Sequence, residues 1–246
     1  MLTLLNWNLE WKKASSRPGR EILRMISAAD PTIICLAEAY DGFLDPSSWH
    51  SVHPGGDSGY PILEGRRKVM LASRSLWTET LTDLDNAPPG RFVSGLTSST
   101  VGPVRVHGVC VPWSHAHVST GRRDRKAWED HIAFLKALIS YDGLVDPVYP
   151  TILVGDFNQT VPPKRAPEEA RELMSALLDK FELAPPKHVE HRTVCHTLFS
   201  PGMRGTAIDE LPAKMDGLRL SDHHGHVHRL VISHQLGSAS GWMEAM

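Results

Sequence analysis

The sequence predicts one domain in which α-helices and β-strands are mixed. Its 246 residues are enough for a single large domain with a sizeable core, and 41% of them are hydrophobic, as in ordinary globular proteins. Short runs of β-branched and apolar residues, typical of buried strands, alternate with longer segments whose apolar residues recur at helical spacing. No repeat or low-complexity linker interrupts this pattern. We therefore expect one domain over residues 1–236 and a polar tail over residues 237–246.

The same patterns locate the individual elements. Strands are expected at residues 2–5, 32–36, 68–73, 104–111, 151–154, 193–198, 206–211 and 226–233, and helices at 20–29, 122–140 and 167–181. The first helix should end at Asp30 because Pro31 follows it, and the third should begin at Pro167, whose fixed φ suits a first helical turn. The segment 41–65 is rich in Gly, Pro, Ser and His and is too long for a simple connector, which is typical of a functional loop.

The strand at residues 151–154 has the most informative ending. Gly155 closes it, and Asp156 and Asn158 follow at its carboxyl end, where α/β folds place their chemistry. A carboxylate and a carboxamide at this spacing can supply a base or charge partner and a neutral donor. Asp and Asn are also ordinary turn residues, so this motif alone leaves both interpretations open.

Several predicted strands end in a polar residue that would be costly to bury without a partner. These residues are Asn8, Glu38, Asp156, Asn158, Asp209 and Asp222. If the strand ends converge, their carboxylates repel one another unless a cation lies among them. Oxygen donors without a Cys₂His₂ spacing favour a hard cation, so the sequence predicts a site for Mg²⁺ or Mn²⁺ ahead of Zn²⁺.

Composition restricts the partners and the compartment. The formal net charge is −2, so any contact with a nucleic-acid backbone must depend on a local basic patch. Cys35, Cys110 and Cys195 lie far apart in apolar segments, which is typical of buried thiols in a reducing compartment. The first residues lack the basic region of a signal peptide, and no segment approaches the ~20 apolar residues of a membrane span. We expect a cytoplasmic protein with no membrane contact and no obligate protein partner.

Five short motifs follow one another along nearly the whole chain: Asn6-Trp7-Asn8, Leu36-Ala37-Glu38, Gly155-Asp156-Phe157-Asn158, Ile208-Asp209 and Ser221-Asp222-His223. In this order they resemble the endonuclease/exonuclease/phosphatase superfamily. The resemblance implies an α+β fold, a four-layered α/β/β/α sandwich of two mixed β-sheets flanked by helices. It also implies hydrolysis of a phosphoester bond with a divalent metal, Mg²⁺ or Mn²⁺.

The resemblance assigns expected roles to the residues around the metal. Glu38 would be the principal metal ligand, Asn8 would complete the metal or phosphate contacts, and Asp222 would face the metal. Asp156 would position and deprotonate the attacking water, and Asn158 would donate to phosphoryl oxygens or hold Asp156 in place.

On the other side of the phosphate, His223 would contact the phosphoryl group, and Asp209 would orient its ring. Whether Asp156 or His223 is the formal base stays open. The resemblance makes Arg122 and Arg125 candidates for substrate contacts, because a basic residue early in this helix often contacts a phosphate in the family. His115 is a further candidate, since it or His117 could reach the phosphate where Cys110 cannot. Basic runs are equally typical of solvated faces.

Two positions depart from the family pattern. Cys110 stands where Tyr or His is usual, and Glu210 follows Asp209 where His or Tyr is frequent. Both departures bear on the substrate class more than on the hydrolytic chemistry.

The remaining histidine clusters and two tryptophans are interpreted as structural residues without a role in catalysis. We interpret His224, His226 and His228 as solvent-facing strand residues rather than extra metal ligands, and His115 and His117 as an exposed pair in a loop. Trp7 and Trp128 are expected in the core.

The sequence thus predicts an enzyme, a metal-dependent phosphodiesterase or nuclease. A phosphomonoesterase acting on a small phosphorylated molecule is the alternative within the same chemistry. A non-catalytic binding protein that keeps the fold is the alternative outside it. A non-catalytic binding protein has no need of so many buried polar groups, so their presence argues against that alternative. The expected partner is a phosphoester substrate, with nucleic acid among the candidates.

Overall fold

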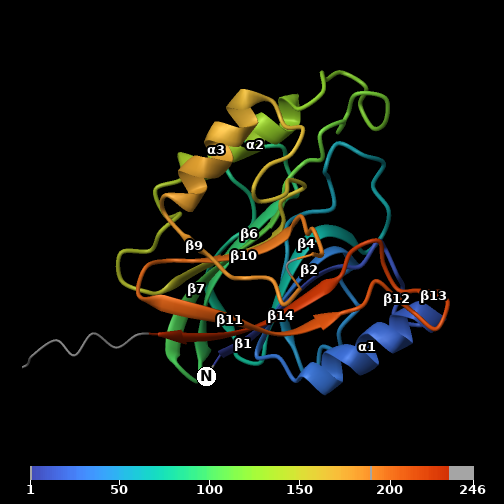
Figure 1. Cartoon of the computed structure of the whole chain (residues 1–246). Coiled ribbons are helices and arrows are strands. Elements are labelled where there is room, and N and C mark those ends of the chain that lie inside the picture. Colours follow the sequence, from blue (N-terminus) through green and yellow to red (C-terminus); the bar gives the residue numbers. More distant parts are fainter. Residues whose placement is uncertain (1, 189, 233–246) are drawn as a thin grey trace, which may run out of the picture.

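The computed structural model describes residues 2–188 and 190–232 and consists of two six-stranded sheets packed face to face (Figure 1). In spatial order, the first sheet contains β11 (Met203–Leu211), β14 (Gly225–Ile232), β1 (Leu2–Asn8), β2 (Ile33–Tyr40), β4 (Arg66–Ser73) and β3 (His50–Val52). The second contains β5 (Trp77–Leu81), β6 (Phe92–Ser99), β7 (Gly102–Cys110), β8 (Thr151–Asp156), β10 (Cys195–Phe199) and β9 (Glu182–Leu183). A separate small hairpin joins β12 (Lys214–Met215) to β13 (Leu218–Arg219).

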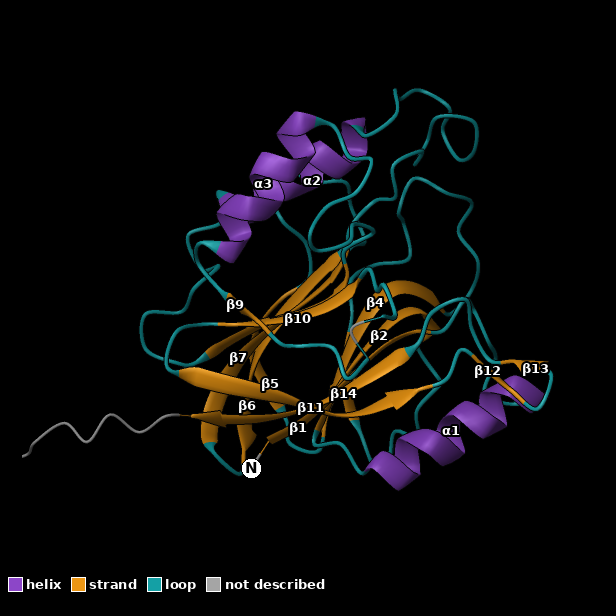
Figure 2. Ribbon diagram, in the orientation of Figure 1, coloured by secondary structure: helices purple, strands orange, loops and turns teal. Residues whose placement is uncertain are grey.

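Three helices cover the outer faces of the sheets. Helix α1 (Arg17–Ala29) lies on one side of the pair of sheets, and α2 (Glu129–Ile139) and α3 (Glu168–Leu178) lie together on the other (Figure 2). Among the described residues, no helix is both long and apolar enough to cross a membrane. The arrangement is the predicted four-layered α/β/β/α sandwich.

Alternation along the strands explains how one short segment serves two cores. Successive strand residues point to opposite faces, so Leu4 packs between the two sheets while Leu5 packs against α1. Ile33 and Ile34 divide in the same way. These strands are buried on both faces, which is why they read as continuous apolar runs rather than as alternating patterns.

Parallel pairs bring the chemically important strand ends together. Strand β1 runs parallel to β2 in the first sheet, and β7 runs parallel to β8 in the second. Gly155 permits a close approach between β8 and β7, because a Cβ on it would lie 1.9 Å from the carbonyl oxygen of Val109. The carboxyl ends of β1 and β8 therefore meet at one edge of the sandwich, where Asn8 and Asp156 lie.

The predicted elements exist, with shifted boundaries. The second helix begins at Glu129 instead of residue 122, because the basic segment before it forms a loop held by ion pairs. Strand β3 lies within the predicted long loop, and the strands at Trp77–Leu81 and Phe92–Ser99 were not expected. The polar residues and the glycine in these two strands interrupt the alternation of apolar residues that would have predicted them. The predicted tail over 237–246 lies outside the described residues.

Candidate active site

Asp156 is the centre of the candidate site. Its side chain is almost completely buried at the end of β8, yet both carboxylate oxygens accept hydrogen bonds. Asn8 Nδ2 donates to Oδ2 over 2.8 Å, and the backbone N–H of Asn158 donates to Oδ1 over 2.9 Å. Burial raises the pKa of Asp156, and the nearby Glu38 carboxylate raises it further, while His223 and the two hydrogen bonds lower it. The net upward shift in pKa makes this carboxylate a stronger base than an exposed one.

His223 lies beside Asp156 and is held by its backbone. Its N–H donates to Ser221 Oγ over 3.1 Å, and its carbonyl accepts from Nε1 of the core residue Trp7 over 2.9 Å. Asp156, Cys195 and His223 each direct a potential ligand atom to one point, all within 4.8 Å of one another. This group combines a carboxylate, a thiol and an imidazole at the junction of the two sheets.

Cys195 is the partner of the His223 ring. Its Sγ lies 3.4 Å from Nδ1 of His223. Burial raises the pKa of the Cys195 thiol well above its usual value, and the Asp156 carboxylate adds to that effect, so the sulfur keeps its proton at neutral pH. A thiol that donates to Nδ1 leaves the proton of a neutral imidazole on Nε2. Nε2 is then the ring nitrogen that can donate to a substrate.

Among the described residues, no hydrogen bond or ion pair joins Asp209 to the His223 ring, so the expected orientation of His223 by Asp209 stays a prediction. Asp209 is half exposed and pairs with Lys187 Nζ at 2.8 Å. The register between β11 and β14 shifts between Ala207 and Asp209, and a bulge of this kind changes which side chains face inward. In consequence the next residue, Glu210, turns its carboxylate into the protein, where its side chain is only 3% exposed.

Glu38 lies within β2, whereas the sequence predicted it just past the end of that strand. Its φ of 48° is in the left-handed region, and Lys68 Nζ binds its Oε1 at 2.7 Å. Its other carboxylate oxygen has no hydrogen-bond partner among the described residues, and the side chain lines a cleft of about 500 Å³. Glu38 therefore already attracts a cation and has an oxygen available for another.

The other predicted metal ligands fit a hard cation by donor type. Asn8 Oδ1 accepts from the N–H of Glu10 over 2.9 Å, and Asp222 is about half exposed, with Oδ1 3.5 Å from Nε2 of His223. All three candidates, Glu38, Asn8 and Asp222, offer oxygen, as Mg²⁺ and Mn²⁺ prefer. These three residues do not form a preorganised metal site. The Asp222 carboxylate lies beside His223, and the Glu38 carboxylate is already paired with Lys68.

Asn158 supports Asp156 more directly than it faces the substrate. Its side-chain Nδ2 donates to the carbonyl of Val111 over 2.8 Å, and its backbone N–H donates to Asp156. Its φ is 50°, a left-handed conformation that Asn tolerates better than most residues. Of the two roles expected for Asn158, these contacts favour holding Asp156 in place.

The basic candidates surround a buried carboxylate. Arg125 Nε binds Asp130 Oδ1 at 2.8 Å, and Arg122 Nη2 lies 3.4 Å from Oδ2. His117 is fully buried and contacts the same Oδ2 through Nδ1 at 2.5 Å, so its predicted exposure in a loop is wrong. His115 is exposed and pairs with Ser114 Oγ at 3.0 Å. The side chains of the two arginines are about one-third exposed, so only part of each is accessible to a substrate.

The histidines of the last strand are also buried, contrary to expectation. His226 is 3% and His228 4% exposed. Burial lowers the pKa of His226 to about 3 and that of His228 to about 4, so both rings are neutral at pH 7. The apolar residues next to these histidines in the sequence could have indicated their burial. When a strand is covered on both faces, the residues that point to either face are buried. Trp7 lies in the core as predicted, and all three cysteines are free and buried.

Sequence reasoning missed two contacts of the candidate site, Lys68 with Glu38 and Cys195 with His223. Lys68 lies opposite Glu38 across the antiparallel pair β2–β4. That pairing depends on the register between distant strands, which no local pattern reveals.

Comparisons with known proteins agree with this fold. The family described as Endonuclease/Exonuclease/phosphatase matches residues 5–172. An AP endonuclease from Archaeoglobus fulgidus is similar with a TM-score of 0.65 and 18% identity, over 93% of this chain and 99% of that one. A 3'-5' exonuclease (NExo) from Neisseria meningitidis is similar with a TM-score of 0.65 and 17% identity, over 94% of this chain and 100% of that one.

A third structure is the 3' phosphatase NExo from Neisseria bound to a product DNA hairpin, with a TM-score of 0.63 and 17% identity, over 93% of this chain and 99% of that one. No protein in the curated comparison matches significantly. At these identities the structural likeness concerns the fold.

Proposed function

The chain belongs to the endonuclease/exonuclease/phosphatase family, and on this premise we propose that it is a phosphoester hydrolase that requires Mg²⁺ or Mn²⁺. We infer that its substrate is a phosphodiester of nucleic acid, cleaved by in-line attack of water on phosphorus. The observation that carries the proposal is the buried Asp156 carboxylate, which is hydrogen-bonded from both sides and lies within 4.8 Å of His223.

Asp156 orients the attacking water and accepts its proton. Its raised pKa brings its basicity closer to that needed at neutral pH. Asn8 and the backbone of Asn158 fix the carboxylate, so little reorganisation accompanies the proton transfer. His223 donates from Nε2 to a phosphoryl oxygen, where negative charge accumulates in the transition state.

Glu38 would hold the divalent cation, with Asn8 and Asp222 as further oxygen donors. When bound, the cation supplies positive charge that stabilises the phosphoryl oxygens. Lys68 adds a fixed positive charge beside Glu38 and is available to contact the phosphate.

The cleft next to Glu38 supports a nucleic-acid end as substrate. Trp11, Tyr60 and Trp113 line it together with Arg66 and Lys68. Trp113 is 43% exposed and donates from Nε1 to the Tyr60 hydroxyl over 3.3 Å. Aromatic rings stack on unpaired bases with a gain of about 1–3 kcal/mol per base, and basic groups attract the backbone. A structurally similar protein bound to a DNA hairpin also favours this substrate class.

A phosphomonoester at a nucleic-acid terminus is the second candidate, favoured by the similar fold of a 3' phosphatase. A substrate panel separates the two: single- and double-stranded DNA, RNA, 3'-phosphorylated oligonucleotides, bis(p-nitrophenyl) phosphate and p-nitrophenyl phosphate. We expect hydrolysis that stops with EDTA and returns with Mg²⁺ or Mn²⁺. Activity that survives exhaustive chelation would rule out the metal requirement.

Mutation of the cleft tests the stacking role. Trp113→Ala should raise the KM for a single-stranded oligonucleotide and leave that for an abasic oligonucleotide of the same length unchanged, because the abasic substrate has no ring to stack. An equal change for both substrates would contradict a base-binding cleft.

A further inference from the structure

The carboxylate of Glu210 lies in an unusual setting beside the candidate active site. Its side chain is 3% exposed, and its Oε2 has no hydrogen-bond partner among the described residues. A buried charge without full compensation is costly, and proteins usually pair it with a cation or a metal. Among the described residues, the basic groups within 4 Å of this carboxylate are three imidazoles.

The three histidines direct the same ring nitrogen at this carboxylate. His191 Nδ1 lies 2.5 Å and His224 Nδ1 3.3 Å from Oε1, and His226 Nδ1 lies 3.8 Å from Oε2. The ligand atoms of His191, Glu210 and His224 are all within 4.8 Å of one another. Nδ1 of His224 is buried and, like Glu210 Oε2, has no hydrogen-bond partner in the part of the chain that the structure describes.

A single ion pair does not satisfy this cluster. A protonated His191 would neutralise Glu210 through Oε1, but it would leave Oε2 and His224 Nδ1 without partners. The separation of 3.8 Å between His226 Nδ1 and Oε2 is too long for a hydrogen bond. Two buried polar atoms of this cluster, Glu210 Oε2 and His224 Nδ1, thus lack a hydrogen-bond partner among the described residues.

We propose that Glu210, His191 and His224 bind a transition-metal cation such as Zn²⁺, with a water molecule as the fourth ligand. Imidazole and carboxylate donors suit Zn²⁺, and its tetrahedral bonds of about 2.0–2.1 Å place neighbouring ligand atoms about 3.4 Å apart. The His224–Glu210 separation already has this value within 0.1 Å. His191 needs to withdraw by about 1 Å, which its loop permits because its side chain is 45% exposed.

His226 borders the site without joining the three ligands. Its Nε2 lies 2.9 Å from Thr193 Oγ1, and its Nδ1 lies 3.8 Å from Glu210 Oε2. His191 and His226 also line a cavity of about 280 Å³, through which a cation can enter.

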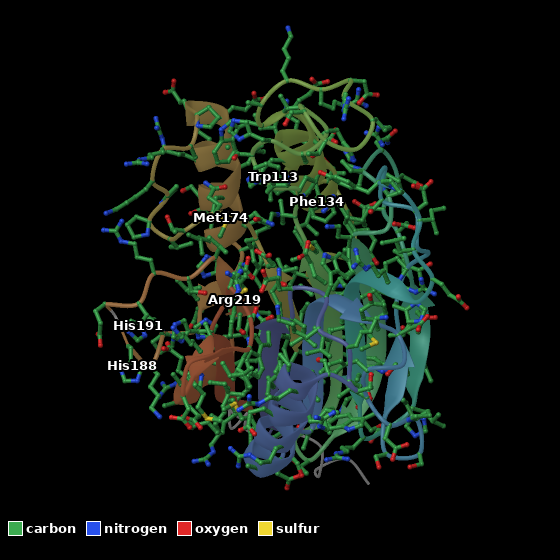
Figure 3. All side chains as sticks on the ribbon, turned by 90° about the vertical axis from the view of Figure 1, so that its right-hand side faces the viewer. Trp113, Phe134, Met174, His188, His191 and Arg219 are labelled. Carbon is green, nitrogen blue, oxygen red and sulfur yellow. The ribbon has the colours of Figure 1, made fainter. Side chains whose placement is uncertain are left out.

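This metal site is separate from the Mg²⁺ or Mn²⁺ site proposed at Glu38 and does not depend on the proposed function. It lies where β11 and β14 meet the loop that carries His188 and His191, which Figure 3 shows at the left edge of the molecule. A bound cation would fasten that loop to the two strands. Because His224 directly follows His223, it would also restrict the position of the His223 backbone.

Metal binding can be measured without any assay of activity. Metal-free protein is titrated with Zn²⁺ by calorimetry and with Co²⁺ by visible absorption, which reports tetrahedral coordination. We expect one Zn²⁺ per chain, a tetrahedral Co²⁺ spectrum and a higher melting temperature with Zn²⁺. Removing a ligand should weaken Zn²⁺ binding by more than the ~10–100-fold typical of a supporting residue.

Three variants locate the site. His191→Asn changes a loop residue whose side chain is 45% exposed, and Glu210→Gln and His224→Asn remove the other ligands. A melting curve establishes that each variant is folded, and all three should lose the high-affinity Zn²⁺ and the Co²⁺ spectrum. His50→Asn, an exposed histidine on β3, and Glu38→Ala should keep both. Zn²⁺ affinity that is absent in the wild type, or unchanged in His191→Asn, would overturn the proposal and leave an ion pair between Glu210 and His191.

Discussion

Asn8 and Asp156 form a hydrogen bond of 2.8 Å that joins the two sheets of the sandwich. Asn8 ends β1 in the first sheet and Asp156 ends β8 in the second, and 148 positions separate them in the chain. The packing of the two sheets therefore sets the geometry of the proposed base. The catalytic proposal depends on this junction more than on any single loop.

The Lys68–Glu38 ion pair should compete with the metal. Lys68→Met keeps the length of the side chain and removes the positive charge that lies 2.7 Å from Glu38. We expect Mg²⁺ to bind roughly tenfold more tightly, equivalent to about 1.4 kcal/mol, while kcat falls because the fixed charge beside the phosphate is lost. Calorimetry and a Mg²⁺ titration of the rate measure the two effects. Weaker Mg²⁺ binding in Lys68→Met would contradict the competition.

Substitutions at Asp209 and Cys195 test which of these two residues acts on the His223 ring. Asp209→Asn removes the charge of a half-exposed ion pair with Lys187 and keeps an oxygen that can accept from the N–H of Glu210. Such exposed ion pairs contribute about 0–1 kcal/mol to stability. Cys195→Ala instead removes the group in contact with the His223 ring. We expect kcat within a few-fold of wild type for Asp209→Asn, and an altered pH profile of kcat/KM for Cys195→Ala. A large loss of kcat in Asp209→Asn alone would support the role that the resemblance implies.

Much of the architecture follows from the sequence, and the failures have identifiable causes. The strands at 151–156 and 33–40 were predictable because continuous apolar runs mark strands covered on both faces. The convergence of Asn8 and Asp156 was predictable from strand ends alone. The bulge before Asp209 was not, because it is defined by pairing with β14 and leaves no local mark. The burial of His226 likewise depends on what covers the strand.

Arg122 and Arg125 are predicted to contribute to the backbone contact with a nucleic acid. Each phosphate neutralised adds roughly 0.9 to the slope of log K against log salt on duplex DNA and ~0.7 on a single strand. The double variant Arg122→Ala/Arg125→Ala should therefore show a shallower salt dependence of binding. It should also melt earlier, because the buried Asp130 loses its two guanidinium partners. Equal salt dependence in both proteins would indicate a different basic patch or a small substrate.

His107 should make the fold sensitive to acid. Burial, assisted by the nearby Arg105 charge, lowers the pKa of His107 to about 4 from an ordinary 6.5. The unfolded chain then binds a proton at higher pH than the folded one, so the stabilisation is complete above pH 6.5 and is lost as the pH falls toward 4. At about 1.4 kcal/mol per pH unit, His107 accounts for roughly 3 kcal/mol across this window.

Urea unfolding at pH 7 and at pH 4.5 measures this loss in the wild type and in His107→Gln. The free energy of unfolding should fall less steeply with acid in the variant, since its side chain does not titrate. His196 and His228, whose pKa values burial also lowers to about 4, remain in both proteins and set the common background. Parallel pH curves would show that His107 is not the group responsible.

The most direct test of the central claim is kcat of Asp156→Asn at saturating Mg²⁺ on the best substrate of the panel. The substitution keeps the shape of the side chain and removes the proton acceptor. General bases contribute about 10²–10⁴-fold, so we predict a loss of at least ~10²-fold. The melting temperature should change little, because losing one hydrogen bond and removing a buried charge act in opposite directions. A folded Asp156→Asn protein with a rate near that of the wild type would contradict the account.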